Sequence, residues 1–153
     1  MLDRVLLVTD LSADSAAAWE VAIELVQRAG RAEFPVLYVA SREAEYAQVE
    51  APRVALRLYD DACRAADEAM KRYVEGCSKR GICARPIVRV GPSADCIAST
   101  ARAELANLIV LGMRPPGVFN RLIGSSIAEV AKLSQCHVLY VKPSKPERGS
   151  DTI

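Results

Sequence analysis

The sequence predicts a doubly wound α/β fold, in which helices cover both faces of a parallel sheet. The first observation is alternation, because strand-like and helix-like segments follow one another in the order βαβαβαβαβ. The second is that two strands, at residues 5–8 and 108–111, consist of consecutive apolar residues, the pattern of strands buried on both faces. Such alternation indicates a parallel sheet joined by right-handed crossovers. The length of 153 residues suits one domain.

The first part of the chain contains two strands separated by one helix. Residues 4–9 are predicted to form the first strand and residues 34–39 the second. Between them, residues 13–29 carry small and branched apolar side chains at helical spacing, which predicts an amphipathic helix. Ser12 is predicted to cap this helix with its hydroxyl, and Gly30 is predicted to end it.

A long helix and a third strand follow. Residues 54–80 place apolar side chains at helical spacing, and Gly81 is predicted to end this helix. Residues 84–90 are typical of a strand, and they include Pro86. Because proline has no N–H to give to a neighbouring strand, Pro86 predicts an edge strand. No conformation is predicted for residues 40–52.

The last part of the chain adds two helices and two strands. Ser93 is predicted to cap a helix that runs to about residue 103. The second buried strand is followed by a loop rich in Gly and Pro, a helix over residues 126–133 and a final strand over residues 137–141. We therefore expect one α/β domain over residues 1–143, followed by a flexible polar tail over residues 144–153.

The charge and cysteine content exclude several classes of protein. The 20 Lys and Arg residues are scattered among 19 Asp and Glu residues, so no basic patch for nucleic acid or an anionic membrane is predicted. No apolar run is long enough to span a bilayer, and no secretory signal is visible, so we expect a cytoplasmic protein. The five cysteines are odd in number and contain no C-x-x-C pair, which favours free thiols over a disulfide framework or a zinc site.

Polar residues follow both buried strands at the point where each strand ends. Thr9 and Asp10 end the first strand, and Gly112 ends the other. Open α/β sheets bind ligands beyond the carboxyl ends of their strands, where the strand order reverses. Two interpretations of Asp10 stay open. Its carboxylate accepts hydrogen bonds from a ligand hydroxyl or amine, or it caps the next helix or orders the loop before it.

The common catalytic patterns are missing from the sequence. It contains no G-x-S-x-G nucleophile elbow, no P-loop and no G-x-G-x-x-G fingerprint. The single histidine, His137, lies at the start of the last strand, where a structural role is expected. A phosphoacceptor receiver domain is rejected, because its third strand would end in an aspartate and here that place holds Arg89-Val90-Gly91. Catalysis needs a base near the reacting group, and Asp10 alone is available, so no enzyme is predicted.

Several segments together resemble the universal stress protein family. Val8-Thr9-Asp10-Leu11-Ser12 resembles the end of the family's first strand, and Leu108-Ile109-Val110-Leu111-Gly112 resembles its fourth strand. Ser126-Ile127-Ala128-Glu129-Val130, followed by Cys136-His137-Val138-Leu139-Tyr140-Val141, resembles its last helix and last strand. The resemblance covers residues 2–143.

The resemblance implies a topology and an assembly. The family has a five-stranded parallel sheet with strand order 3-2-1-4-5, in which the strand that contains Pro86 lies at an edge, as the proline predicts independently. The resemblance also implies a homodimer formed through the last strand. Residues 138–141 of that strand form an apolar run, and pairing of two identical open edges about a two-fold axis would cover it.

Family members that bind ATP carry Gly-x-x-Gly, nine further residues, and then Gly-Ser or Gly-Thr. When the two sequences are aligned on the last helix, Gly112 matches the first glycine and Ser126 matches the hydroxyl residue. Pro115 and Ser125 stand where the other two glycines are expected. Glycine lets the backbone approach a phosphate, whereas proline fixes φ and has no N–H to donate.

Other residues of this loop still offer groups to a phosphate. Gly117 and Gly124 lie nearby but out of register with the motif, and Arg114 would supply a cation. Backbone N–H groups at the N-terminus of the last helix also favour an anion. The predicted nucleotide-binding residues are Thr9, Asp10, Gly112, Arg114, Gly117, Gly124, Ser125 and Ser126.

Two functions follow from these observations. The first is a small, non-enzymatic, cytoplasmic stress-response or signalling protein with a degenerate ATP-binding loop, whose affinity for ATP is weak or absent. The alternative is an ATP-binding universal stress protein that senses nucleotide or hydrolyses ATP slowly. A metal site is not predicted in either case.

Overall fold

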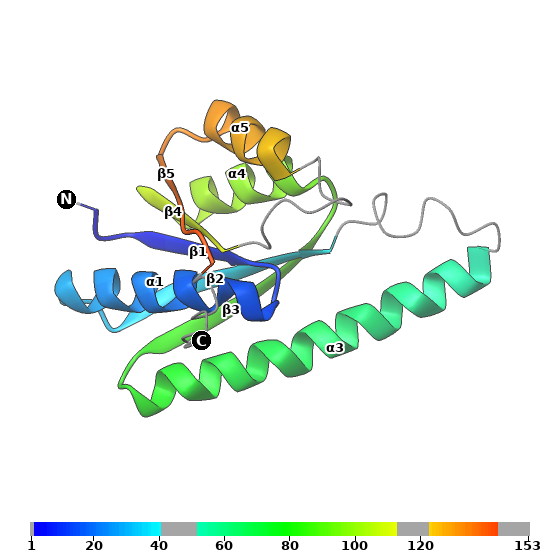
Figure 1. Ribbon diagram of the computed structural model, residues 1–153, viewed down its shortest axis with the longest axis horizontal. Helices are drawn as coiled ribbons and strands as arrows, with labels where there is room; N and C mark the ends of the chain where they lie inside the picture. The colour runs from blue at the N-terminus through cyan, green and yellow to red at the C-terminus, as the bar shows by residue number, and fades with distance from the viewer. Residues whose placement is uncertain (1, 41–51, 113–122, 144–153) are drawn as a thin grey trace, which may run out of the picture.

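A five-stranded parallel sheet forms the centre of the protein, with strand order β3-β2-β1-β4-β5 (Figure 1). The computed structural model describes residues 2–40, 52–112 and 123–143. The strands are β1 (Val5–Thr9), β2 (Glu33–Ala40), β3 (Cys83–Val90), β4 (Leu108–Gly112) and β5 (His137–Tyr140). The helices are α1 (Ala16–Arg28), α3 (Pro52–Lys79), α4 (Ser93–Ala103) and α5 (Ile123–Leu133), and a 3-10 turn, η1 (Ala13–Ser15), precedes α1. The predicted fold class and strand order are confirmed.

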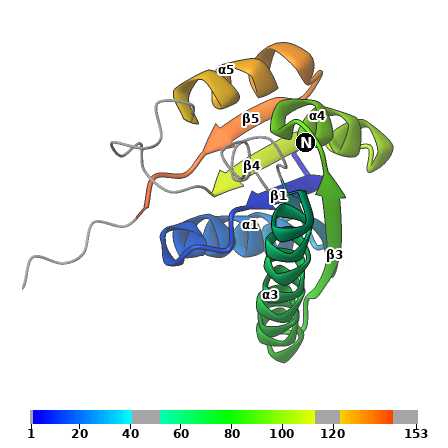
Figure 2. The same cartoon turned by 90° about the vertical axis from the view of Figure 1, so that its right-hand side faces the viewer.

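The helices form a layer on each face of the sheet. Helices α1 and α3 cover one face, and α4 and α5 cover the other (Figure 2). Within β1, Leu7 faces α1 and α3, while Leu6 faces α4 and α5, and neither side chain is exposed. This two-sided burial explains why β1 and β4 are continuous apolar runs rather than alternating ones.

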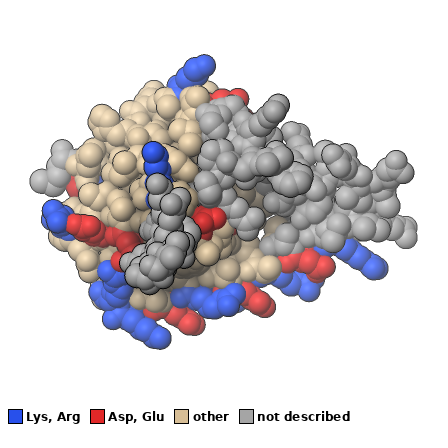
Figure 3. Space-filling model, viewed as in Figure 1, with Lys and Arg blue, Asp and Glu red and all other residues tan. Residues whose placement is uncertain are grey.

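The long helix α3 packs on the sheet through its second half. Ala66, Met70 and Cys77 are buried there, as helical spacing predicts. Tyr73 stacks on Trp19 of α1 with ring centroids 4.4 Å apart, so the two helices also contact each other. On the outward side, Figure 3 shows basic and acidic side chains interspersed along the lower edge of the molecule, as expected for a solvated helix face.

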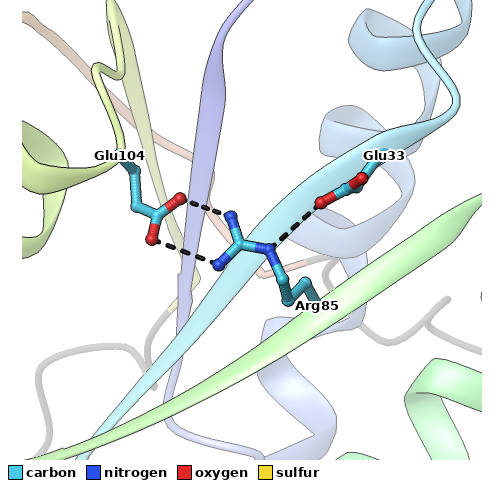
Figure 4. Close-up of polar contacts among 3 residues, drawn as sticks. All are labelled: Glu33, Arg85 and Glu104. Atoms are coloured by element: carbon cyan, nitrogen blue, oxygen red, sulfur yellow. Dashed lines mark hydrogen bonds and ion pairs between the residues drawn. The ribbon is translucent and has the colours of Figure 1, made fainter.

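The edge strand β3 is joined to its surroundings by an arginine. Pro86 lies in this strand and the strand forms one edge of the sheet, as predicted. Arg85 donates from Nε to Glu33 Oε1 at 3.1 Å and forms a two-pronged pair with Glu104, which follows α4 (Figure 4). The hydrogen bonds from Arg85 lower the pKa of Glu104, and they raise the pKa of Arg85 itself. These bonds connect the edge strand to both β2 and α4.

Two predicted helix starts differ from the structure, and a third, after Ser12, lies at the predicted position but lacks the predicted cap bond. The Ser12 side chain makes no cap hydrogen bond, and the helical chain begins with the short turn η1 before α1. Ser93 is the first residue of α4, and Pro92 occupies the cap position. Helix α5 begins at Ile123, three residues before the predicted start at Ser126. Capping preference alone does not place the starts of α4 and α5, because Ser93 and Ser126 lie inside these helices rather than before them.

The amino ends of the strands are held together by a carboxylate. Asp3 accepts hydrogen bonds from Arg31 Nη2 at 2.9 Å and from Asn107 Nδ2 at 3.0 Å. These two hydrogen bonds lower the pKa of Asp3 from 3.8 to about 2. Arg31 follows α1 and Asn107 precedes β4, so one half-buried carboxylate bridges the chain on both sides of β1.

We expect Asp3 to make part of the stability depend on acid pH. Its pKa is lower in the folded protein than in the unfolded chain, so its contribution is present above 3.8 and is lost as the pH falls towards about 2. Urea unfolding of the wild type and of Asp3→Asn should give a stability difference that is constant near neutral pH and shrinks across this window. If the stability difference between the two proteins stayed the same down to a pH of about 2, Asp3 would not be the cause.

Candidate functional site

The carboxyl ends of β1 and β4 lie side by side. Thr9 is paired with Gly112 in the parallel register of these strands. Beyond the last pair, the Asp10 N–H donates to the Gly112 carbonyl at 3.3 Å. The predicted neighbourhood of the first and fourth strands is therefore confirmed, and Asp10 lies directly against the end of β4.

A chain of buried hydroxyl groups shapes the loop after β1. Thr9 Oγ1 accepts the N–H of Leu11 at 3.0 Å and donates to Ser15 Oγ, also at 3.0 Å. Ser15 Oγ in turn donates to the Ser12 carbonyl at 2.7 Å. Thr9, Ser12 and Ser15 are 3%, 7% and 0% exposed, so these bonds are formed away from solvent. Buried polar groups that are fully hydrogen-bonded rigidify the surrounding chain.

Asp10 completes the loop. Its Oδ1 atom accepts both the N–H of Ser12 at 2.9 Å and the Oγ–H of Ser12 at 2.5 Å. This is the loop-ordering role, one of the two interpretations that the sequence left open. Contact of Asp10 with a ligand stays a prediction.

Leu11 adopts a backbone conformation that non-glycine residues seldom adopt. Its φ is 62°, in the left-handed region. Crowding of Cβ makes this conformation cost about 1–2 kcal/mol for an L-residue. The hydrogen bonds that Ser12 donates across Leu11 to Asp10, and the packing of the Leu11 side chain on the core around α1, offset that cost. Strain of this kind is concentrated at functional sites in proteins.

Gly112 is required by packing at the end of β4. A Cβ atom placed there would lie 2.6 Å from Ala18 Cβ and 3.2 Å from Ser15 Cβ. The sequence predicted a glycine that admits a phosphate, and the structure shows that the start of α1 already needs this space. The role of Gly112 towards a ligand stays a prediction.

The other predicted residues belong to the chain after β4. Arg114, Pro115 and Gly117 lie outside the described residues. Gly124 and Ser125 lie in the first turn of α5, whose backbone begins at Ile123. The free N–H groups of a helix belong to its cap and its first three residues. The N–H groups available to an anion are therefore those of residues 123–125 rather than those that follow Ser126.

Two residues of this site were not identified from the sequence. Leu11 gives no signal, because leucine does not favour a left-handed φ. Ser15 stands three residues after Ser12, where a capping box would carry Glu or Gln, but its buried links to Thr9 and Ser12 depend on the tertiary arrangement. His137 begins β5, so it lies at the amino edge of the parallel sheet, opposite the candidate site.

The described part of the chain offers few alternatives to this site. Its His, Cys, Asp and Glu side chains form no group of three that could hold a metal ion. A cleft of about 650 Å³ lies at the amino edge, but its acidic residues Asp3, Glu33 and Glu104 are all paired with arginines. All five cysteines are free thiols, and burial raises the pKa of Cys77, Cys96 and Cys136. No described helix combines the length and apolar character needed to cross a bilayer.

Comparison with known proteins identifies a family. The model of the universal stress protein family matches residues 1–142. Universal stress protein UspA from Lactobacillus plantarum is 21% identical and superposes with a TM-score of 0.76 over 93% of this chain and 99% of its own. None of the curated proteins matches the chain.

Two similar structures are described with nucleotides. A universal stress protein in complex with cAMP is 22% identical, with a TM-score of 0.57 over 94% of this chain and 100% of its own. A universal stress protein from Archaeoglobus fulgidus in complex with dAMP is 19% identical, with a TM-score of 0.62 over 93% of this chain and 100% of its own. At these identities the likeness shows a shared fold.

We expect Gly112→Ala to destabilise the protein, because the new Cβ overlaps Ala18 Cβ. Overpacking of this kind costs about 1–3 kcal/mol, measured as the free energy of unfolding in urea. The double variant Gly112→Ala with Ala18→Gly should lose less stability than the two single losses added together, because it removes the overlapping atom. Additive losses would show that the contact is not the cause.

Proposed function

The chain belongs to the universal stress protein family, and from this membership we propose that it is a small, non-enzymatic stress-response or signalling protein of the cytoplasm with a degenerate ATP-binding loop. The observation that carries the proposal is the pair Pro115 and Ser125, which stand where ATP-binding members have glycine. Proline cannot donate an N–H to a phosphate, and a side chain at the second position hinders close approach of the backbone.

The geometry around β1 supports a binding role without catalysis. The loop from Thr9 to Ser15 is held by internal hydrogen bonds, which suits a preformed surface beyond the sheet. Among the described residues at the ends of β1 and β4, Asp10 has an ionisable side chain. Its Oδ1 atom already accepts two hydrogen bonds from Ser12. A general base must reach the proton that it abstracts, so this arrangement favours a ligand-ordering role over hydrolysis.

The second candidate function is an ATP-binding protein that senses nucleotide or hydrolyses ATP slowly. The similar structures described with cAMP and dAMP favour it. Gly117 and Gly124 would then provide the close backbone approach in a different register from the usual motif. The two functions differ in one measurable quantity, the affinity of the wild type for ATP.

We expect calorimetry with ATP and magnesium to show weak or no binding by the wild type. The double variant Pro115→Gly with Ser125→Gly should bind more tightly, because each restored N–H contact to a charged phosphate contributes about 1.5–3 kcal/mol, or roughly tenfold or more in affinity. Tight binding by the wild type would replace this proposal by the second candidate.

The role of Asp10 is tested in the same double variant. Asp10→Asn keeps an oxygen for the two Ser12 hydrogen bonds and removes the charge, whereas Asp10→Ala also removes those bonds. Lower affinity in both variants would indicate a direct contact with the ligand. Lower affinity in Asp10→Ala alone would restrict Asp10 to ordering the loop.

We also propose that the protein is a homodimer formed through β5, which is the edge of the sheet opposite β3. The N–H groups of His137 and Val141 point towards β4, since they donate to Asn107 and Leu111. Neighbouring residues of a strand alternate in direction, so the N–H groups of Val138 and Tyr140 face the open edge. Leu139 is 39% exposed beside them. An apolar edge whose N–H groups have no partner among the described residues favours pairing with a second copy.

Light scattering should therefore report a dimer at micromolar concentration. Val138→Pro removes an N–H from the open edge and should shift the protein towards monomer, because the pairing bond is lost while the bonds to β4 remain. Val138→Ala keeps the N–H and serves as the matched control, which should stay dimeric. A monomeric wild type, or a Val138→Pro dimer of unchanged affinity, would count against β5 as the interface.

A further inference from the structure

We propose that Thr9 is a positioning residue of the carboxyl-edge site: its buried hydroxyl fixes the φ and ψ of Asp10 and thereby sets the direction of the Asp10 carboxylate. Thr9 is 3% exposed, so its side chain acts through its neighbours. Its importance for a ligand rests on the proposed function, but the positioning itself is a property of the ligand-free protein.

The hydroxyl of Thr9 is fully engaged within the loop. It accepts the Leu11 N–H and donates to Ser15 Oγ, each at 3.0 Å. The acceptor is placed two residues before Leu11 along the chain, so this bond closes over Asp10 and depends on the φ and ψ of Asp10. Without the acceptor, the Leu11 N–H loses its partner, and the φ and ψ of Asp10 are no longer held by this bond.

Leu11 lies between Asp10 and Ser12, which are hydrogen-bonded to each other. Its φ and ψ decide where Ser12 lies relative to Asp10, because the chain passes from one residue to the other through Leu11. In the observed conformation, both the N–H and the Oγ–H of Ser12 reach Asp10 Oδ1, at 2.9 and 2.5 Å. Relaxation of Leu11 to an ordinary negative φ would move Ser12 away and release the carboxylate.

Ser15 ties this arrangement to β4. Its hydroxyl receives the hydrogen bond from Thr9 and passes one on to the Ser12 carbonyl at 2.7 Å. The backbone of Ser15 also lies against Gly112, since a Cβ at Gly112 would come within 3.3 Å of the Ser15 carbonyl oxygen. The loop that carries Asp10 is therefore aligned on the end of the neighbouring strand, where the proposed nucleotide site lies.

The alternative is that Thr9 only fills space and satisfies buried groups under the start of α1. A matched pair of variants separates the two roles. Thr9→Val has nearly the same shape but no hydroxyl, whereas Thr9→Ser keeps the hydroxyl and loses a methyl group. Packing alone predicts that Thr9→Ser is the more damaging variant for the loop, and positioning predicts that Thr9→Val is.

The test is nuclear magnetic resonance of the ligand-free, full-length protein. Three signals are read: amide exchange of Leu11 and Ser12, the Asp10 coupling that reports φ, and the chemical shift of the Asp10 carboxyl carbon. In Thr9→Val we expect exchange of the Leu11 amide to rise roughly tenfold, the value for one lost hydrogen bond of about 1.4 kcal/mol, with a changed Asp10 coupling and a changed Asp10 shift. Thr9→Ser should restore all three, and core amides such as Leu7 and Val110 should be unaffected.

A second comparison keeps the test decisive if Thr9→Val is poorly folded. Glycine adopts a positive φ without steric cost, so Leu11→Gly should restore stability in the Thr9→Val background, while the Asp10 signals should stay changed because the Thr9 bond is still missing. Unchanged Asp10 signals in Thr9→Val, or Asp10 signals that Leu11→Gly alone restores, would overturn the proposal. Because these signals are measured without nucleotide, they decide the positioning role separately from the ATP titration, which decides the proposed function.

Discussion

The pairing of β1 with β4 is the interaction on which the rest of the structure depends. Both strands are buried on both faces, and their register brings Thr9 opposite Gly112. The helices on each face bury alternate residues of these strands, so a shift of the register would exchange the two sides of the core. The same pairing places the loop after β1 beside the chain that leaves β4, which is where a ligand would be bound.

Close packing at the carboxyl ends of β1 and β4 restricts which residues of the site can be substituted. The start of α1 leaves no room for a side chain at Gly112, and the buried hydroxyls of Thr9 and Ser15 fix the loop that turns back at Leu11. These constraints apply whether or not a nucleotide binds. A chain could therefore keep the architecture of a nucleotide site around β1 while its phosphate loop diverges, as Pro115 and Ser125 indicate for this protein.

The sequence predicted the sheet well because burial leaves a simple pattern. The apolar runs of β1 and β4 and the proline in β3 were sufficient to infer central and edge strands. Local hydrogen bonding was harder to infer, because the Ser12 hydroxyl can accept an N–H from the following helix or donate to Asp10, and the structure shows that it donates to Asp10 without a cap bond. The left-handed φ of Leu11 could not be predicted, since leucine alone disfavours it and its compensation comes from the bonds that Ser12 donates to Asp10.

The measurement that tests the central claim most directly is the nucleotide content of the protein purified from cells. Denaturation releases any bound nucleotide, and chromatography then quantifies it against protein. A degenerate phosphate loop predicts far less than one adenine nucleotide per chain, because a weak ligand is lost during purification. A content close to one ATP per chain would contradict the account and would show that the chain after β4 forms a working phosphate site by another arrangement.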